Sequence, residues 1–301
     1  MRWRGKLPFA MQQLDIFADS RDRVLLNLLA EALAQHDLSA SRAAADALRS
    51  AYPDDRHLGA AAALIEALAT EAAAGKTPLP DATAVLSVRL AIAQTQRPAA
   101  VDLLGSETAA VWLAHRWRAL ACRATALPYD TATASAHAAS LYLQAQAWAE
   151  AVAAVETIAS WRRRPQPLAW MAEAIWHLRG ADSAWPLLAE LAWMAPTRLP
   201  PLLAQLPDPG LHKLARRFEG ALDGQAAWAW WPAWLLVDQP LLAAVLQDAQ
   251  PGADTPPERG FRLLLSLLRL ERLGRHHDIV ALRQALKALH PGLFAAYMAL
   301  R

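Results

Sequence analysis

The chain has 301 residues, enough to bury a large apolar core in one long domain or two smaller ones. Hydrophobic residues make up 55% of the sequence and charged residues 19%, a balance that excludes an intrinsically disordered protein. The formal net charge of +2 is too small to indicate nucleic acid or an anionic membrane as an obligatory partner.

Residue usage predicts an all-α protein. Ala and Leu dominate the sequence, and both are strong helix formers. Val, Ile, Thr, Tyr and Phe are sparse, and no long run alternates apolar and polar residues as a half-buried strand would. The longest apolar run, residues 226–237, contains Pro232 and is shorter than the roughly 20 residues that a membrane-spanning helix needs. We therefore expect a soluble, cytoplasmic protein without a membrane partner.

The first feature in chain order is a short run that combines Gln13, Leu14, Asp15, Ile16 and Phe17. It is similar to the linear motif by which bacterial replication and repair proteins dock on the ring-shaped DNA sliding clamp, which reads Gln-Leu, then Ser or Asp, then Leu, then Phe. Four positions agree, and Ile16 replaces Leu conservatively. The resemblance implies that Gln13 forms a hydrogen bond at the edge of the clamp's pocket and that Asp15 stays solvated. Leu14 would fill a subsite, and Ile16 with Phe17 would enter the deep apolar pocket.

Docking requires this run to lie on a free N-terminal tail, which we place at residues 1–18. The first predicted helix begins at a cap residue, Asp19 or Ser20, and carries an apolar stripe that includes Val24. Phe17 lies just before this cap, so its ring could instead pack on Val24 as a hydrophobic staple. The sequence leaves both roles open, docking motif and structural staple.

Helix signals then recur along the chain with short breaks, and most of the 20 prolines lie between the predicted helices. Short connections favour antiparallel neighbours. The predicted helices span about 19–35, 39–52, 54–74, 80–95, 106–123, 131–146, 148–161, 167–179, 182–194, 210–222, 225–236, 239–248, 257–273 and 277–289.

Four segments share one order of features: a helix, a tight turn, a second helix of about 12 residues and a proline. The turns are centred on Asp37, Ala147, Ala181 and Arg275, and the closing prolines are Pro53, Pro165, Pro196 and Pro291. This order resembles the tetratricopeptide repeat, whose helix pairs turn at a Gly-Asp-Tyr-like segment and close at a proline. The resemblance implies antiparallel helix pairs stacked into a right-handed solenoid, with an extended curved surface for a partner.

The repeat divides the chain into three predicted parts. The N-terminal tail with the linear motif covers residues 1–18, and the helical-repeat region covers residues 19–225. Residues 226–301 form a C-terminal helical lobe that continues or caps the solenoid.

No motif predicts catalysis, a metal site or a cofactor. Residues 75–77, Gly-Lys-Thr, resemble the end of a phosphate-binding P-loop, but Thr70 stands where that loop needs glycine, and a helix precedes where it needs a strand. Residues 276–278, His-His-Asp, are adjacent, and adjacent side chains on a helix point about 100° apart, so they do not converge on one ion. Cys122, the only cysteine, allows no intrachain disulfide and is expected to be a small buried residue.

The sequence contains 13 tryptophans, and we expect most of them to fill space between Ala-rich helices. The alternative is an aromatic groove for a peptide or platforms for stacking bases. Four of the tryptophans cluster around Pro232: Trp228, Trp230, Trp231 and Trp234. Because four rings so close together cannot all face one core, an exposed aromatic patch is predicted here.

Two groups of arginines could form basic surfaces. The groups are Arg162, Arg163 and Arg164, and Arg259, Arg262, Arg269, Arg272, Arg275 and Arg283. Acidic residues partly neutralise the second group, so solvated helix faces are favoured over nucleic-acid binding.

These features together predict a non-catalytic helical-repeat adaptor or scaffold that binds another protein. Docking to the sliding clamp through residues 13–17 is one form of this function. Two alternatives stay open: a helical protein that binds nucleic acid through Arg and Trp surfaces, and an enzyme whose dispersed catalytic residues form no sequence motif.

Overall fold

The protein is all-helical in the part of the chain that the structure describes. The computed structural model describes residues 10–219, 225–274 and 276–300, and the side chains of residues 21–219, 227–274 and 277–300. Every regular element in these ranges is an α-, 3-10 or π-helix, and none of them contains a strand. The all-α prediction is therefore confirmed.

The chain forms two compact units, Met1–Gln146 and Ala147–Arg301. The boundary falls at the predicted tight turn around Ala147, inside the region 19–225 that the sequence analysis treats as continuous. Each unit has its own set of buried side chains and is described by itself below.

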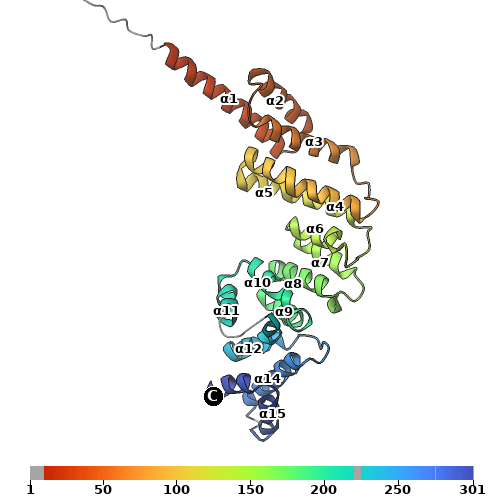
Figure 1. Ribbon diagram of the computed structural model, residues 1–301, viewed down its shortest axis with the longest axis vertical. Coiled ribbons are helices and arrows are strands. Elements are labelled where there is room, and N and C mark those ends of the chain that lie inside the picture. Colours follow the sequence, from red (N-terminus) through yellow and green to blue (C-terminus); the bar gives the residue numbers. More distant parts are fainter. Residues whose placement is uncertain (1–9, 220–224, 275, 301) are drawn as a thin grey trace, which may run out of the picture. The chain divides into compact units, whose positions relative to one another are not determined.

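Helices of the first unit pack on their neighbours in the sequence. Contacts join α1 to α2, α2 to α3, α3 to α5 and α5 to α6, and Figure 1 shows these helices as successive layers. Buried residues recur at helical spacing, as at Leu29 and Leu33 of α1, which gives each helix one apolar face. The elements are α1 (Ala10–Ala34), α2 (Leu38–Ala51), α3 (Leu58–Ala74), α4 (Ala82–Ala91), the π-helix η1 (Ile92–Gln96), α5 (Arg97–Ala124), η2 (Ala134–Ala136) and α6 (Ala138–Gln144).

One long helical run in this unit turns back at a glycine. α4, η1 and the first part of α5 follow one another directly, and helical dihedral angles stop only at Gly105, with φ 72° and ψ 165°. The predicted gap between the helices at 80–95 and 106–123 is therefore wrong for residues 96–104. Pro98 is the second residue of α5 and follows a wide π-helical turn, in which the Arg97 N–H donates to the Ile92 carbonyl. This wider turn accommodates the proline ring and its missing N–H, so the helix continues.

Helices of the second unit also contact helices that lie close to them in the sequence. Contacts join α7 to α8, α8 to α9, α12 to α14, α14 to α15 and α15 to α16. The α-helices are α7 (Trp148–Glu156), α8 (Pro165–Arg179), α9 (Ala181–Met194), α10 (Leu199–Gln205), α11 (Pro209–Glu219), α12 (Trp231–Asp238), α13 (Ala243–Leu246), α14 (Pro256–Arg272), α15 (His276–Leu289) and α16 (Pro291–Ala299). Short 3-10 helices connect them: η3 (Trp161–Arg163), η4 (Pro196–Arg198), η5 (Gln225–Trp230) and η6 (Pro240–Leu242).

The four predicted helix–helix turns share one backbone feature. The first residue of each turn has a positive φ: 57° at His36, 54° at Gln146, 85° at Gly180 and 69° at Gly274. At His36, Gln146 and Gly274 the N–H donates to the carbonyl oxygen three residues earlier, at 3.0, 3.0 and 3.1 Å. This bond is typical of a helix that ends at a left-handed residue. A helix therefore ends at the start of each predicted turn, as expected.

Tryptophan rings form much of the core of the second unit, as predicted for most of them. Trp176 and Trp185 meet edge to face, with ring centroids 5.8 Å apart and planes inclined by 74°. Trp231 lies 5.7 Å from Trp185, and Trp228 lies 6.3 Å from Trp231. Such pairs stabilise a core beyond the area that they bury, by about 0.5–1.5 kcal/mol each.

The exposed aromatic patch predicted at the four clustered tryptophans is wrong. Trp228 and Trp231 are 6% and 2% exposed, and Trp230 and Trp234 are half-buried. The chain changes from 3-10 to α-helix between Trp230 and Trp231, which turns the rings toward different neighbours. Trp230 and Trp234 have ring centroids 4.5 and 6.2 Å from that of His290, while the other two join the core.

Cys122 is exposed, so its predicted burial is also wrong. Its neighbour Ala121 and the nearby Leu120 face the core of the first unit. Adjacent residues on a helix diverge by about 100°, so an apolar sequence context does not place Cys122 on the buried face. The Cys122 Sγ lies 3.5 Å from the hydroxyl oxygen of Tyr142.

In the described ranges, no helix taken singly combines the length and the apolar composition of a membrane span. The two helical segments Ala227–Asp238 and Pro240–Leu246 meet both criteria when they are taken together. The chain bends by 106° at the break between them.

Candidate binding groove in the first unit

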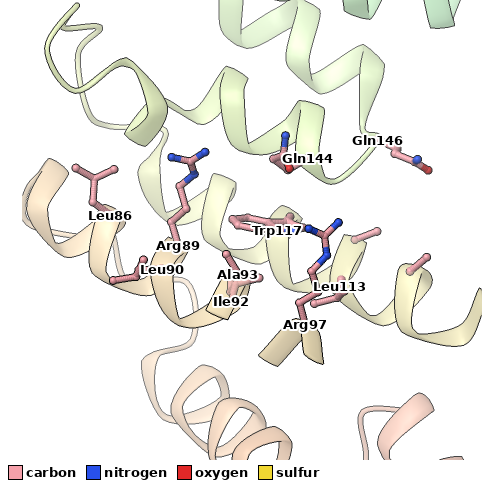
Figure 2. A pocket seen from close by; sticks show the side chains of 12 residues that line it. Leu86, Arg89, Leu90, Ile92, Ala93, Arg97, Leu113, Trp117, Gln144 and Gln146 are labelled. Atoms are coloured by element: carbon pink, nitrogen blue, oxygen red, sulfur yellow. The ribbon is translucent and has the colours of Figure 1, made fainter. Parts of the chain in front are cut away.

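A groove with a volume of about 700 Å³ opens on the first unit. Its walls come from three stretches of chain: residues 86–97 of α4, η1 and α5, residues 110–117 of α5, and residues 144–146 at the end of α6 (Figure 2). We call it the α4–α6 groove. Residues 86–97 and 110–117 lie on opposite sides of the Gly105 break, so that break brings the first two walls together.

The floor of the α4–α6 groove is apolar. Ile92 and Leu113 are 1% and 8% exposed and form its base. The Trp117 ring is half-buried in the middle of the groove, and Leu90 is 55% exposed at its edge (Figure 2). Leu90 and Trp117 therefore retain apolar surface that a partner would bury, which favours association.

Small side chains keep this space open. Ala93, Ala110 and Ala114 line the groove at positions where longer residues would fill it. Ala93 and Ala110 are exposed, and Ala114 is half-buried. The small side chains of these three residues therefore leave room for the groove between its two helical walls.

Among the described residues, Arg89 and Arg97 are the only charged side chains that line the groove. Arg89 is half-buried on α4 and Arg97 is exposed at the start of α5, and Figure 2 shows them on either side of Trp117. Within the described residues, neither guanidinium has an ion-pair or hydrogen-bond partner. Gln144 and Gln146 add neutral amides, so the lining combines positive charge with an apolar floor.

A buried arginine behind the floor fixes the π-helix in place. Arg116 is 6% exposed, pairs with Glu71 of α3, and lies 5.7 Å over the Trp112 ring. Its Nε–H donates to the side-chain oxygen of Gln96 in η1, at 3.2 Å. Burial lowers the pKa of Arg116 to about 10, and the charge of Arg123 adds to the effect, so the guanidinium stays charged at neutral pH. One side chain thus connects α3, η1 and α5.

His36 packs on the same tryptophan. Its ring is stacked on Trp112, with centroids 5.9 Å apart and planes 9° apart, and lies 4.2 Å from the ring of His115. Burial lowers the pKa of His36 from 6.5 to about 4, and the charge of His115 contributes further. The imidazole is therefore neutral at pH 7, as a stacked, partly buried ring should be.

The backbone of residues 13–17 lies inside α1, which begins at Ala10. The structure differs here from the predicted free tail at residues 1–18 and from the predicted helix start at Asp19 or Ser20. A helical backbone is the reverse of the extended form that clamp docking needs, and no helix start lies beside Phe17 for a staple. The side chains of residues 13–17 lie outside those that the structure describes, so their binding roles stay predictions.

Arginines of the second unit are largely engaged within the fold. Arg162 donates to both carboxylate oxygens of Glu190, at 2.7 and 2.6 Å. Arg283 donates to Glu271 at 3.2 Å. Arg275 lies outside the described residues. Arg162 and Arg283 therefore make contacts within the fold and are not free members of the two possible basic surfaces.

Among the described residues, the other sequence motifs do not bring catalytic or metal-binding side chains together. Residues 75–77 lie in the connection between α3 and α4, so a helix precedes them and not the strand of a P-loop. His277 and Asp278 are exposed on α15. In the described part of the chain, no group of three or more His, Cys, Asp and Glu side chains could hold a metal ion.

No protein-family model, curated protein or solved structure matches this chain. No sequence motif predicts the α4–α6 groove either. Its signals were present: Arg89-Leu90 places charge beside an exposed apolar residue, and Pro98 marks the distorted helix. Neither signal predicts a groove by itself, because the second wall lies beside these residues only through the break at Gly105.

Proposed function

We propose that this chain is a non-catalytic helical-repeat protein that binds another protein, and that the α4–α6 groove is its binding surface. The observation that supports this most directly is the lining of the groove. An apolar floor with a half-buried Trp117 is flanked by Arg89 and Arg97. Tryptophan and arginine are the residues most enriched at the energetic centres of protein interfaces.

The proposed architecture is a tetratricopeptide-like, right-handed solenoid of antiparallel helix pairs. Two observations support it. Several helix pairs joined by one turn contact each other, as α1 with α2, α8 with α9 and α14 with α15, and the first residue of each of the four predicted turns has a positive φ. A stack of this kind presents grooves between neighbouring helices, and repeat proteins use such surfaces to bind partners.

Binding is favoured over catalysis by the types of side chain that line the groove. The lining consists of Leu, Ile, Ala, Trp, Arg and Gln. These side chains can position a ligand, but none of them exchanges a proton near neutral pH or serves readily as a nucleophile. The expected affinity is in the micromolar range, because burial of a few apolar side chains is offset by the ordering of the bound segment.

Selection of random peptides on the intact chain tests this proposal. Selected peptides should bind the wild-type chain and lose at least about tenfold in affinity for the double variant Ala93→Gln, Ala110→Gln, which fills the groove with neutral side chains. Both positions are exposed and helical, so the variant should fold.

The matched control is Ala43→Gln, Ala47→Gln, which makes the same change at two exposed positions of α2 outside the groove. This variant should keep wild-type affinity. The proposal fails if selection enriches no peptide, or if every enriched peptide binds the groove variant as tightly as the wild-type chain.

A further inference from the structure

The charge and the dimensions of the α4–α6 groove indicate which kind of segment fits it. We propose that its occupant is a helical segment of a partner protein, with an apolar stripe and with two carboxylates seven or eight residues apart. This inference rests on the proposed function and adds the chemistry and the conformation of the partner.

The charge of the lining selects acidic partners. Arg89 and Arg97 have no ion-pair partner in the described chain, and no carboxylate lines the groove. A guanidinium offers a planar fork of donors that matches a carboxylate, and a basic segment would be repelled. Opposite charges across an interface also raise the association rate and exclude wrong partners.

The spacing of the two arginines defines the spacing of the acids. Arg89 and Arg97 are eight residues apart along the nearly continuous helix of α4, η1 and the start of α5. At 1.5 Å per residue, their backbones are about 12 Å apart, too far for one phosphate or one carboxylate to bridge. A partner helix that runs along this wall has the same rise, and its residues i and i+7 lie on one face.

Apolar surface lies between the two cations. Leu90 and Ile92 fall between Arg89 and Arg97 in the sequence, and Trp117 faces them from the second wall (Figure 2). A partner helix would therefore place its apolar residues between its two acids, three or four positions from each. This pattern is the helix-in-groove mode of recognition.

A helix fits this lining better than an extended peptide does. The backbone N–H and C=O groups of a bound extended strand need partners, and each buried group left without one is costly. Two of the walls are helices, which pair most of their own backbone groups, and Gln144 and Gln146 are the neutral polar side chains that the described lining offers to a strand. A helix satisfies its own backbone and needs only side-chain contacts.

A designed peptide tests the inference on the intact chain. The probe is a helical peptide with two Glu seven residues apart and two Leu between them, three and four positions after the first Glu. Its affinity for wild-type protein should exceed by about tenfold that of the same peptide with Gln at both Glu positions. The variant Arg89→Gln, Arg97→Gln should remove this difference, while the control Arg23→Gln, Arg42→Gln, at exposed arginines outside the groove, should keep it.

The outcomes separate this inference from the proposed function. If selected peptides bind in the groove but tolerate Gln in place of their acids, or carry acids about four residues apart as an extended strand would, the inference is overturned and the proposed function stands. If no peptide shows groove-dependent binding, both are overturned. A single-stranded oligonucleotide that binds wild-type protein but not the Arg89→Gln, Arg97→Gln variant would point to a nucleic-acid partner and overturn the inference.

Discussion

A single glycine determines where the long helix of the first unit turns back. Gly105 has φ 72° and ψ 165°, a backbone conformation that is essentially restricted to glycine. An added Cβ at this position would meet no atom within 4 Å, so a substitution there is opposed by backbone strain and not by a steric clash.

Gly105→Ala should therefore lower the free energy of unfolding by about 1–3 kcal/mol, as measured by urea titration. Gly59→Ala is the matched control, since Gly59 lies in α3 with an ordinary helical backbone and also has nothing near its Cβ position. That change should stabilise the protein by up to about 1 kcal/mol, because alanine favours the helix. Equal effects of the two substitutions would contradict the assigned role of Gly105.

His36 should make the stability of the protein depend on pH. Its pKa is lowered from 6.5 to about 4 in the folded protein, mainly by burial. Well above pH 6.5 the ring is neutral in both states, so it contributes nothing to the pH dependence there. As the pH falls toward 4, the unfolded chain binds a proton that the folded protein does not bind, so the free energy of unfolding falls. The ring is partly exposed, so the loss should be about 1–2 kcal/mol, below the full value of the shift.

Urea titrations at pH 7 and pH 4.5 measure this effect. His36→Asn, which keeps a residue that tolerates the left-handed backbone at this turn, should show a weaker fall in stability than the wild-type chain. Some pH dependence should remain in the variant, because burial also lowers the pKa values of His137 and His177. An unchanged pH dependence in the variant would contradict this account.

At the scale of elements, Arg116 connects α3, η1 and α5. Glu71→Gln would leave its buried guanidinium without a carboxylate, so we expect the free energy of unfolding to fall by about 2–3 kcal/mol. The ion pair between Arg49 and Asp46 is the exposed counterpart, at 2.7 Å and with both side chains more than half exposed. Asp46→Asn should cost less than about 0.5 kcal/mol. Similar losses in the two variants would show that burial does not decide the strength of these pairs.

The helical conformation of α1 leads to a specific test of the predicted clamp motif. Residues 13–17 are helical in the structure, whereas docking requires an extended segment. If the motif docks, a peptide of residues 1–20 should bind a purified bacterial sliding clamp severalfold more tightly than the intact chain, because the intact chain must first unwind part of α1. Leu14→Ala, Phe17→Ala should abolish binding in both. Absence of binding by either form would end the docking hypothesis.

Turn residues and helix-forming residues in the sequence predict much of the fold. The features that the sequence does not predict depend on contacts between residues far apart in the chain or on which face of a helix a residue occupies. Gly180 and Gly274 mark helix turns in the sequence because glycine tolerates a left-handed backbone, and the structure has such turns at both positions. The π-helix is different, since its Gln96 is held by Arg116, twenty residues away. Cys122 shows the limit of reading composition alone, because one step of about 100° along α5 moves it from the core to the surface.

The α4–α6 groove could not be predicted for the same reason. Its charged and apolar components, Arg89 and Leu90, are visible in the sequence, but its second wall around Trp117 joins them only through the Gly105 break. The prediction of an exposed patch around Trp231 was wrong because it expected too much exposed surface. A change of helix type distributes those rings among separate neighbours within the fold.

At the scale of the whole molecule, some tryptophans fill the cores of the two units, while Trp117 lines the α4–α6 groove. The second unit packs Trp176, Trp185, Trp228 and Trp231 into its core. The first unit leaves Trp117 half-buried in an open, positively charged groove. The proposed protein-binding function is therefore assigned to the first unit, and the tryptophan cluster of the second unit is assigned to stability.

The location of a bound peptide tests this assignment most directly. Methyl and indole NMR signals of the intact chain can be followed while the designed acidic helical peptide is added. Our account predicts that the largest shifts occur at the methyl groups of Leu90, Ile92 and Leu113 and at the indole N–H of Trp117, with little change at Leu28 of α1 or at Leu241 of the second unit. Saturable shifts confined to the second unit, or centred on α1, would contradict the assignment of the α4–α6 groove as the binding surface.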